Sequence, residues 1–272
     1  MYLLVLPRGT ATRNPDEHRR RGRFFNTWFY GGSVLSRTYE VLQQLEKEQG
    51  APLPGPGSNG HRKVLPVAAS EEVLRLVQQV FRTSPDQPRV VVFSSVGPGD
   101  GCTWVCMNSA LTLASQNPGS LCVVDANLRS PSLHKEFGID NREGLSDALS
   151  QSGSIRNYVQ QIAGSNLWVL PAGSAANLQP QMVFETLRVR IAELRAEFET
   201  VLIDAPPASI YSDAVQLGRL SDGVILVLQG NTTRRESALS VKDSFDAANV
   251  RLLGAVLNKR TFPIPQKLYN RL

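Results

Sequence analysis

The sequence predicts an α/β fold of three layers, in which a mostly parallel central sheet has helices on both faces. Between residues 68 and 262, six short apolar segments alternate with segments of helical periodicity. Most of the apolar segments lack polar/apolar alternation, which is typical of parallel strands buried on both faces. The first of them runs through a glycine-rich turn into a helix, in "VVVFSSVGPGDGCTWVCMNSALTLA" at residues 90–114. The chain has 272 residues, 42% of them hydrophobic, which is enough to bury a sizeable core.

Three segments precede this domain. Residues 1–33 are arginine-rich and then aromatic, and we expect an irregular basic and aromatic extension there. Residues 34–49 carry apolar side chains at helical spacing before Gly50, which predicts an amphipathic helix. Residues 50–67 are rich in proline and glycine and are interpreted as a linker. The domain then spans residues 68–262, and residues 263–272 form a short C-terminal tail.

The helices of the domain are predicted from apolar residues that recur three and four positions apart. The first, "ASEEVLRLVQQVFRT", has Ser70 as a capping residue and acidic side chains in its first turn. In chain order, the expected helices span residues 69–83, 102–116, 144–152, 179–198, 212–220 and 234–248.

The strands are predicted from short apolar runs between these helices. They span residues 89–95, 120–126, 166–173, 199–207, 222–230 and 251–259. Ligands of such sheets bind outside the carboxyl ends of the strands. The candidate functional residues should therefore lie in the turns that follow the strands.

Charge and cysteine content restrict the class of protein. The formal net charge is +5, and much of the excess lies in "RNPDEHRRRGRFF". This permits contact with an anionic surface without requiring one, and we expect no nucleic-acid partner. The three cysteines have neither metal-ligand spacing nor even pairing, which favours a reduced, cytoplasmic protein. No stretch approaches the roughly 20 apolar residues that span a bilayer, and "MYLLVLP" is too short for the core of a secretory signal.

The turn after the first strand has the frame of a phosphate-binding loop. Pro98, Gly99, Asp100 and Gly101 precede a helix whose N-terminus would attract an anion. Thr103 stands where a hydroxyl binds Mg²⁺ in such loops. Two positions depart from the pattern: Val96 replaces the first glycine, and Cys102 stands where the lysine should be.

Three further polar residues end apolar strands. Asp125 follows "LCVV" and could hold a metal ion, or it could merely cap the next helix. Asp204 follows "TVLI" in a Walker B pattern, which places a carboxylate near the metal, although generic α/β strands also end in this way. Asn258 ends "GAVLN" and could hydrogen-bond the edge of an adenine.

In this order and spacing, the segments "DANLRSPSLHKEFGI", "GLSDAL", "LPAG" and "VLIDAPP" resemble the bacterial tyrosine kinases (BY-kinases) of capsular exopolysaccharide biosynthesis. Those kinases are P-loop proteins related to the MinD/ParA ATPases, and the resemblance covers residues from about 70 to 260. "LSRTYEVLQQLEKE" also resembles the start of many members, with Leu35 where the initiator methionine would be. The resemblance implies a MinD/ParA-like P-loop NTPase fold.

The resemblance also assigns roles to single residues. It makes Asp204 the Walker B aspartate and Asp125 the first aspartate of the Walker A′ motif. These two residues are the expected catalytic carboxylates, and with Thr103 they are the expected Mg²⁺ ligands. The nucleotide would lie against residues 98–103 and Asn258.

This chain departs from the family pattern at four places. Besides Cys102, Asn127 replaces the second Walker A′ aspartate and cannot act as a base at neutral pH. The end of the chain has only Tyr269 where the family has a tyrosine-rich tail. In the assembly motif of the first helix, Glu72 and Arg75 match but Gln78 replaces the second arginine. Because phosphoryl transfer relies on positioning and charge stabilisation, these losses predict weak or absent turnover of ATP.

Three functions remain open on these grounds. The first is a degenerate kinase-like protein that regulates capsule or exopolysaccharide synthesis or export and binds ATP and Mg²⁺ weakly. The second is an active ATP-dependent tyrosine autokinase, in which a nearby basic residue such as Arg234 or Arg235 replaces the missing charge. The third is a MinD/ParA-like membrane-positioning ATPase.

The expected partners follow from the same resemblance. They are a membrane polysaccharide co-polymerase or adaptor protein and further copies of the chain in a homo-oligomer. We expect indirect contact with the inner face of the cell membrane. The basic and aromatic stretch "HRRRGRFFNTWFYGG" could lie on anionic lipid, or it could be an unstructured tail.

Overall fold

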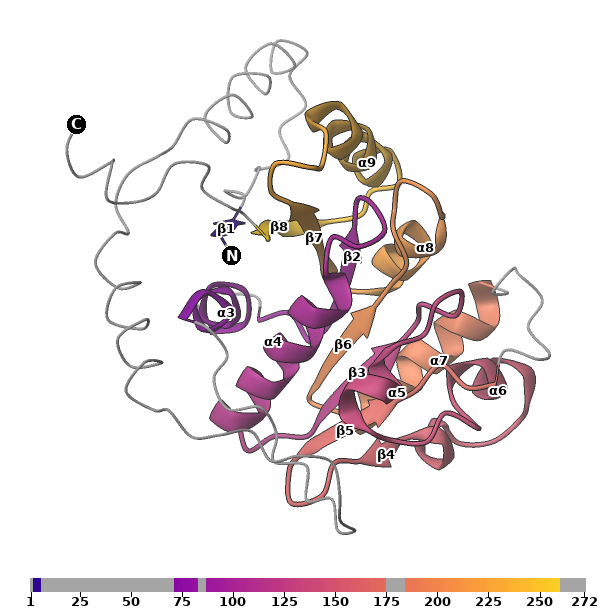
Figure 1. Cartoon of the computed structure of the whole chain (residues 1–272). Coiled ribbons are helices and arrows are strands. Elements are labelled where there is room, and N and C mark those ends of the chain that lie inside the picture. Colours follow the sequence, from indigo (N-terminus) through magenta and orange to yellow (C-terminus); the bar gives the residue numbers. More distant parts are fainter. Residues whose placement is uncertain (1, 6–70, 83–86, 175–183, 260–272) are drawn as a thin grey trace, which may run out of the picture. The chain divides into compact units, whose positions relative to one another are not determined.

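The central feature of the domain is an eight-stranded sheet, seen in the computed structural model of the chain, which describes residues 2–5, 71–82, 87–174 and 184–259 (Figure 1). The strand order is β1-β8-β7-β2-β6-β3-β5-β4, and the six inner strands run parallel. The bounds of these six are β2 Val90–Ser95, β3 Leu121–Asp125, β5 Leu167–Leu170, β6 Thr200–Asp204, β7 Gly223–Gln229 and β8 Leu252–Asn258. They are the six strands predicted from the sequence, and the mostly parallel α/β fold is confirmed.

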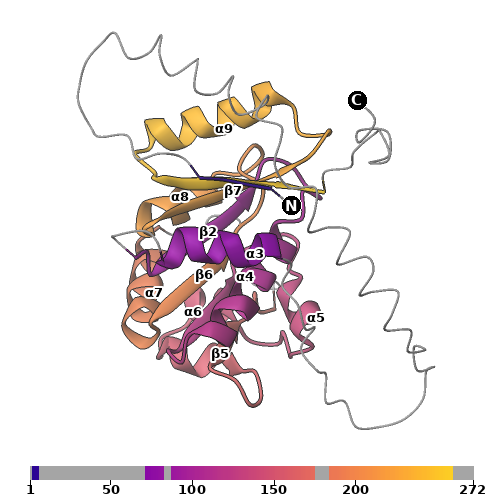
Figure 2. The same ribbon diagram turned by 90° about the vertical axis from the view of Figure 1, so that its left-hand side faces the viewer.

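Helices cover both faces of the sheet. On one face lie α3 (Glu71–Val77), α4 (Cys102–Gln116) and α5 (Leu133–Phe137). On the other lie α6 (Leu145–Ser150), α7 (Phe184–Glu197), α8 (Asp213–Leu220) and α9 (Arg235–Ala247). Figure 2 shows β7 and β8 between α9 on one side and α3 on the other. The fold therefore has the three predicted layers.

The two hydrophobic cores explain why the strands read as continuous apolar runs. In β2, Val90 and Val92 pack into the core under α6–α9, whereas Val91 and Phe93 pack into the core under α3–α5. Successive side chains of a strand point to opposite faces, so a strand covered on both sides needs an apolar residue at every position. All six residues of β2 are buried.

One N-terminal strand differs from expectation. Residues 1–33 were expected to be irregular, but Tyr2–Val5 form β1, which pairs antiparallel with β8 in the register Tyr2↔Leu257 to Val5↔Gly254. Four apolar residues are too few to show a period in the sequence, and their pairing partner lies about 250 residues away. The expected helix 34–49, the linker 50–67, the tail 263–272, Leu35 and Tyr269 lie outside the described residues.

The remaining differences are short elements. The helices at α5 and η2 (Ile155–Tyr158) and the two-residue antiparallel strand β4 (Gln160–Gln161) were not predicted from the sequence. The first helix of the domain changes from α3 to a π-helical turn, η1, at Gln78–Arg82. The change begins at Gln78, the position at which the family pattern has its second arginine. Beyond this point the residues no longer follow the α-helical spacing of Glu72 and Arg75, so they do not extend the same face of the helix.

Candidate nucleotide-binding site

The loop between β2 and α4 has the backbone expected of an anion-binding loop. Gly99 and Gly101 adopt left-handed conformations, with φ of 82° and 89°. A Cβ atom on Gly101 would lie 2.3 Å from Asn258 Nδ2, so this position also requires glycine on steric grounds. No side chain caps the N-terminus of α4. The first N–H groups of this 15-residue helix can therefore meet a phosphate.

Contacts from three other segments hold the loop. The carboxylate of Asp100 accepts a hydrogen bond from Gly97 N at 2.8 Å and one from the Thr233 hydroxyl at 3.5 Å. Asn258 Nδ2 donates to the carbonyl of Asp100 at 2.9 Å, and Lys259 Nζ donates to the carbonyl of Gly99 at 2.7 Å. The Ser209 hydroxyl donates to the Val96 carbonyl at the start of the loop. The loop thus keeps a defined shape although its own lysine is missing.

Two carboxylates lie at the ends of neighbouring strands. Asp125 of β3 and Asp204 of β6 are direct cross-strand partners, and both are almost completely buried. Thr103, on the first turn of α4, donates its hydroxyl hydrogen to Asp204 Oδ2 at 2.6 Å. The structure therefore brings together the three residues that were predicted as metal ligands.

Asp125 is also held by backbone groups. Its Oδ2 atom accepts hydrogen bonds from the N–H groups of Ser132 and Leu133, both at 3.0 Å, and its Oδ1 atom accepts one from Asn127 N at 3.2 Å. The expectation that such an aspartate caps a helix is met, since Ser132 and Leu133 begin α5. A capping role leaves Asp125 beside Asp204 and does not exclude a role toward a metal.

Burial raises the pKa of both carboxyl groups. The pKa of Asp204 is raised to about 7, chiefly by burial and further by the charge of Asp125, while hydrogen bonds from Thr103 and Cys102 offset part of the rise. The pKa of Asp125 is raised by burial to about 6, and its three backbone N–H partners act in the opposite direction. Buried neighbouring carboxylates of this kind cluster at functional sites.

Cys102 does not replace the chemistry of the missing lysine. Its side chain is buried against the core under α4, and burial, then the neighbouring Asp204, raises the pKa of its thiol well above the ordinary value. The thiol is therefore neutral at physiological pH and brings no positive charge to the loop. Cys106, one helical turn further on, is also buried with a raised pKa.

The donor set at the strand ends fits Mg²⁺. The ion prefers oxygen ligands and is usually bound by one or two carboxylates together with water and substrate phosphates. Asp204 Oδ1 is buried and has no hydrogen-bond partner among the described residues, so an oxygen ligand is left over at this point. Thr103, Asp125 and Asp204 would hold the ion, which would supply positive charge to neutralise phosphate oxygens.

The other predicted site residues lie in or near the loop and at the start of α9. Pro98 and Gly99 are exposed at the tip of the loop, and Asp100 is buried beneath it. Asn127 uses its Oδ1 atom locally, as the acceptor for Ser130 N at 3.3 Å. Arg234 lies exposed at the start of α9.

Sequence reasoning missed three residues that contact the site. Ser132 places its hydroxyl 3.4 Å from that of Thr103, Thr233 reaches Asp100, and Lys259 reaches Gly99. Of the three, Lys259 alone could have been predicted from the sequence. It is a basic residue that directly follows Asn258, which had been predicted as a site residue at the end of a strand. Ser132 and Thr233 are common loop residues whose roles depend on the tertiary structure.

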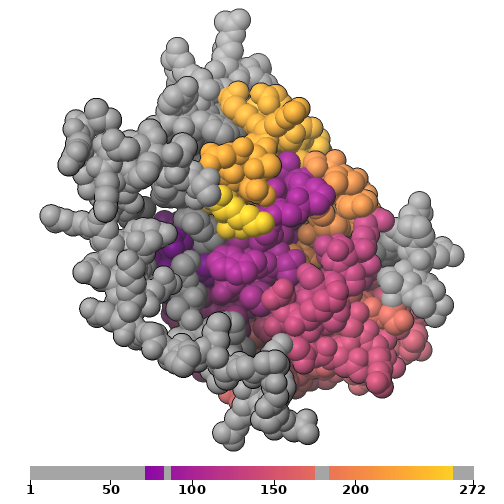
Figure 3. Space-filling view, in the orientation of Figure 1, coloured from indigo at the N-terminus to yellow at the C-terminus, as the bar shows by residue number. Residues whose placement is uncertain are grey.

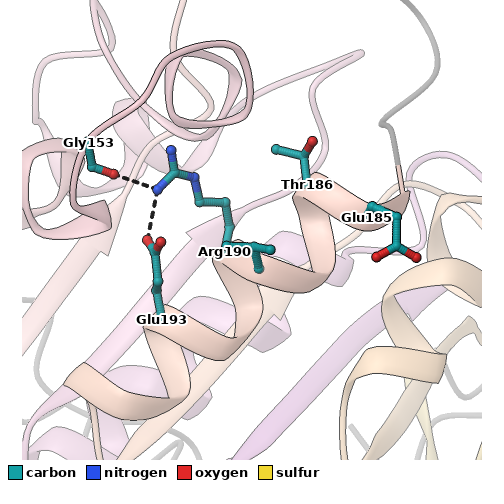
Figure 4. Close-up of a pocket in the computed structure, with 6 residues that line it drawn as sticks. Gly153, Glu185, Thr186, Arg190 and Glu193 are labelled. Carbon is teal, nitrogen blue, oxygen red and sulfur yellow. Dashed lines mark hydrogen bonds and ion pairs between the residues drawn. The ribbon is translucent and has the colours of Figure 1, made fainter.

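A separate pocket lies on the α7 face and contains none of the predicted residues. It is lined by Gly153, Glu185, Thr186, Val189, Arg190 and Glu193 (Figure 4). The guanidinium of Arg190 crosses it to the Gly153 carbonyl and to Glu193. The charge of Arg190 is thus used on groups within the protein.

Comparison with known proteins finds that the chain is similar in sequence to bacterial tyrosine-protein kinases. No protein-family model matches it. It is 29% identical over 209 residues to the tyrosine-protein kinase YwqD of Bacillus subtilis, a match that covers 74% of this chain and 88% of that protein. It is 28% identical over 179 residues to the tyrosine-protein kinase Wzc of Salmonella typhimurium, covering 65% of this chain but only 25% of Wzc.

Several solved structures are also similar to this chain. The kinase domain of VpsO is 28% identical, with a TM-score of 0.62 over 70% of this chain and 93% of that one. The chimeric protein CapA2B2 has a TM-score of 0.66 at 22% identity, covering 81% and 99% of the two chains. MinD of Pyrococcus horikoshii, solved with Mg-ADP, has a TM-score of 0.53 at 20% identity, covering 64% and 74%. The last two likenesses concern the fold alone, which is that of the MinD/ParA-like P-loop proteins.

Proposed function

The homologues of this chain are bacterial tyrosine-protein kinases, and from that premise we propose that it is a degenerate kinase-like protein that regulates capsule or exopolysaccharide synthesis or export. In this role it binds ATP and Mg²⁺ weakly and turns ATP over slowly or not at all. Its expected output is a change in how it docks on a partner rather than a phosphorylated product.

The observation that carries this proposal is the neutral, buried thiol of Cys102 where the loop lysine belongs. The lysine of a P-loop reaches the β- and γ-phosphates and helps to stabilise charge in the transition state. Loss of one such contact typically costs a rate factor of about 10² to 10³. The rest of the loop, with Thr103 and Asp204 in contact, supports residual binding of the nucleotide.

An active autokinase is the second candidate. It is favoured by the paired, buried carboxylates at the ends of β3 and β6. A protein that catalyses no reaction does not need two buried carboxylates side by side. A membrane-positioning ATPase is supported by the shared fold alone, because YwqD and Wzc, to which this chain is similar in sequence, are tyrosine-protein kinases.

The proposed partner is a membrane polysaccharide co-polymerase or adaptor, with further copies of this chain in a homo-oligomer. Support comes from the kinase homologues and from the fold likeness to a chimera that joins two named parts, CapA2B2. No helix among the described residues is long and apolar enough to cross a membrane. We therefore propose that contact with the membrane passes through the partner.

Calorimetry with Mg-ATP, together with a phosphotyrosine assay of the full chain, tests this function. We expect dissociation constants above the micromolar range and no accumulation of phosphotyrosine. Asp204→Asn, which removes the Walker B charge, serves as the reference for background. Sub-micromolar binding would contradict the weak binding proposed, and time-dependent phosphotyrosine above that reference would instead establish the autokinase.

A further inference from the structure

The end of β8 is attached to the phosphate loop by two side chains. Asn258 Nδ2 donates to the Asp100 carbonyl at 2.9 Å, and Lys259 Nζ donates to the Gly99 carbonyl at 2.7 Å. These contacts join residues that are 158 and 160 positions apart in the sequence. In Figure 3, the yellow end of the described chain lies against the purple segment that contains the loop and α4.

The backbone around Lys259 is arranged to permit this contact. Lys259 has a φ of 51°, a left-handed conformation that is uncommon for residues other than glycine, asparagine and aspartate. Gly101 allows the close approach, because a Cβ atom there would lie 2.3 Å from Asn258 Nδ2 and 3.6 Å from Lys259 Cε. Conformations of this kind persist where the surrounding structure determines them, and they cluster at functional sites.

These two contacts set the direction of the loop N–H groups. In a trans peptide the carbonyl and the N–H point to opposite sides. With the Gly99 carbonyl bound to Lys259 and the Asp100 carbonyl bound to Asn258, the N–H groups of Asp100 and Gly101 point away from β8. The Asp100 N–H makes a long hydrogen bond of 3.5 Å to the Gly97 carbonyl, and among the described residues the Gly101 N–H makes none, so both can turn toward an anion.

The ammonium of Lys259 also brings charge to a loop that has lost its own lysine. Its side chain is exposed, and one of its three N–H donors is used on Gly99. Its charge acts on Asp100, whose pKa is raised by burial and partly brought back by hydrogen bonds and by Lys259. Among the described residues the ammonium makes this one hydrogen bond, which leaves two donors for an anionic ligand.

We infer that Lys259 is a positioning residue of the nucleotide site, which orients the phosphate loop for the polyphosphate group and takes over part of the charge lost at Cys102. The inference rests on the proposed nucleotide binding. It differs from the expectation that Arg234 or Arg235 supplies the missing charge. It assigns that role to a residue whose contact with the loop is observed.

The test compares Lys259→Met, Lys259→Arg and the control Lys242→Met with the wild-type chain. Lys242 lies on α9, paired with Asp246, so its variant removes one positive charge away from the loop. The affinity for Mg-ATP and for pyrophosphate is measured by calorimetry. Amide hydrogen exchange of residues 97–101 is measured without ligand, and melting temperatures verify that each variant is folded.

We expect Lys259→Met to weaken binding of both ligands at least fivefold and to accelerate exchange in the loop. Lys259→Arg keeps the charge and should restore most of the affinity, whereas Lys242→Met should match the wild type. Equal affinity of Lys259→Met and wild type would overturn the inference. If the wild type binds neither ligand, the proposed nucleotide binding fails, and loop exchange decides the inference alone: unchanged exchange in Lys259→Met overturns it.

Discussion

Cys102 is the residue that most separates this chain from a standard phosphate loop. Its thiol is buried, neutral and close to Asp204, so an acidic group that would face a lysine ammonium is already in place. Thr103 and both loop glycines keep the positions that phosphate binding needs. The defect is therefore local, and one substitution should repair much of it.

We predict that Cys102→Lys tightens binding of Mg-ATP at least tenfold, about 1.4 kcal/mol. The new ammonium lies at the positive end of α4, where bound phosphate relieves its repulsion with the helix dipole. Calorimetric titration measures the effect, and Cys102→Ser, which fills the site without a charge, is the control. If Cys102→Lys binds no better than this control, the loop has no latent nucleotide site.

Catalysis should return less readily than binding. Asn127 is half-buried and spends its Oδ1 atom on Ser130 N, an interaction that an aspartate can also make. We predict that Cys102→Lys combined with Asn127→Asp hydrolyses ATP faster than either single variant, measured as phosphate release. A double variant no faster than Cys102→Lys would show that the second Walker A′ carboxylate is not what limits turnover.

The raised pKa of Asp204 predicts how stability depends on pH. Unfolded, the group titrates near its ordinary value of 3.8, but in the fold its pKa is about 7, because of burial and Asp125. Between these values the unfolded chain releases a proton that the folded chain keeps, so this group lowers the free energy of unfolding as the pH rises. The loss is complete above about pH 7.

We therefore expect Asp204→Asn to raise the melting temperature of the metal-free protein at about pH 8, by roughly 3 °C or more, and to change it much less at about pH 4.5. Asparagine can still accept the hydrogen bond of Thr103, so the difference between Asp204→Asn and the wild type reports the effect of the carboxylate charge on stability. Differential scanning calorimetry of both proteins at the two pH values provides the measurement. An equal change at both values would contradict the assigned pKa.

At the scale of single elements, α6 depends on a side chain from α7. The guanidinium of Arg190 is almost fully buried and donates to the carbonyls of Ala148, Gln151 and Gly153, at 2.6 to 2.7 Å. These carbonyls lie at and just beyond the C-terminal end of α6, where a helix leaves acceptors unsatisfied. The Glu193 carboxylate completes the set at 2.8 Å (Figure 4).

We predict that Arg190→Met lowers the free energy of unfolding by about 2–4 kcal/mol, because it strands buried acceptors and a carboxylate. Arg188→Met is the matched control on the same helix, since Arg188 makes an exposed ion pair with Glu185 and its loss should cost less than about 0.5 kcal/mol. Urea unfolding of the two variants provides the comparison. Similar losses for both would show that the buried contacts add nothing.

The elements that the sequence predicted have a pattern that can be recognised locally, and they include short ones such as β5 and α6. The central strands and helices α4, α7 and α9 were predicted because turn residues lie at both ends of each apolar or helical pattern. The elements that were missed are short: β1 and β4 exist because the edges of β8 and β5 offer them hydrogen-bonding partners, which a local pattern does not contain. The π-helical turn at Gln78 likewise has no local signal.

For the site, the sequence predicted groups that follow strands, because parallel topology collects strand ends at one edge. Asp125, Asp204 and Thr103 were identified in this way, and their contact is observed. The contacts of Ser132 and Lys259 depend on how loops close over that edge, which is a tertiary property. The degree of ATP turnover is a matter of charge and remains a prediction.

At the scale of the whole molecule, β1 changes what a truncation should do. Residues 1–33 were expected to form an irregular extension, yet Tyr2–Val5 pair with the edge of β8. We predict that a chain starting at Leu35 still folds, because the core residues that the structure describes all come after residue 70, but melts lower and associates at high concentration through the exposed edge. Circular dichroism and sedimentation velocity test both parts. A shortened chain that associates no more than the full chain and melts like it would contradict the role of β1.

The attachment of the phosphate loop to β8 has a consequence for how the protein matures. The loop is synthesised early, but Asn258 and Lys259, which hold its shape, follow their partners in the loop by 158 and 160 positions. Asp204, which accepts the hydrogen bond of the Thr103 hydroxyl, follows Thr103 by 101 positions. Contacts across such separations pay their loop-closure entropy late and form slowly. A chain still leaving the ribosome would hold the glycine turn without its supports. A nascent or fragmentary domain should therefore be unable to bind nucleotide. The ability to bind it should appear in one step, when β8 joins the sheet.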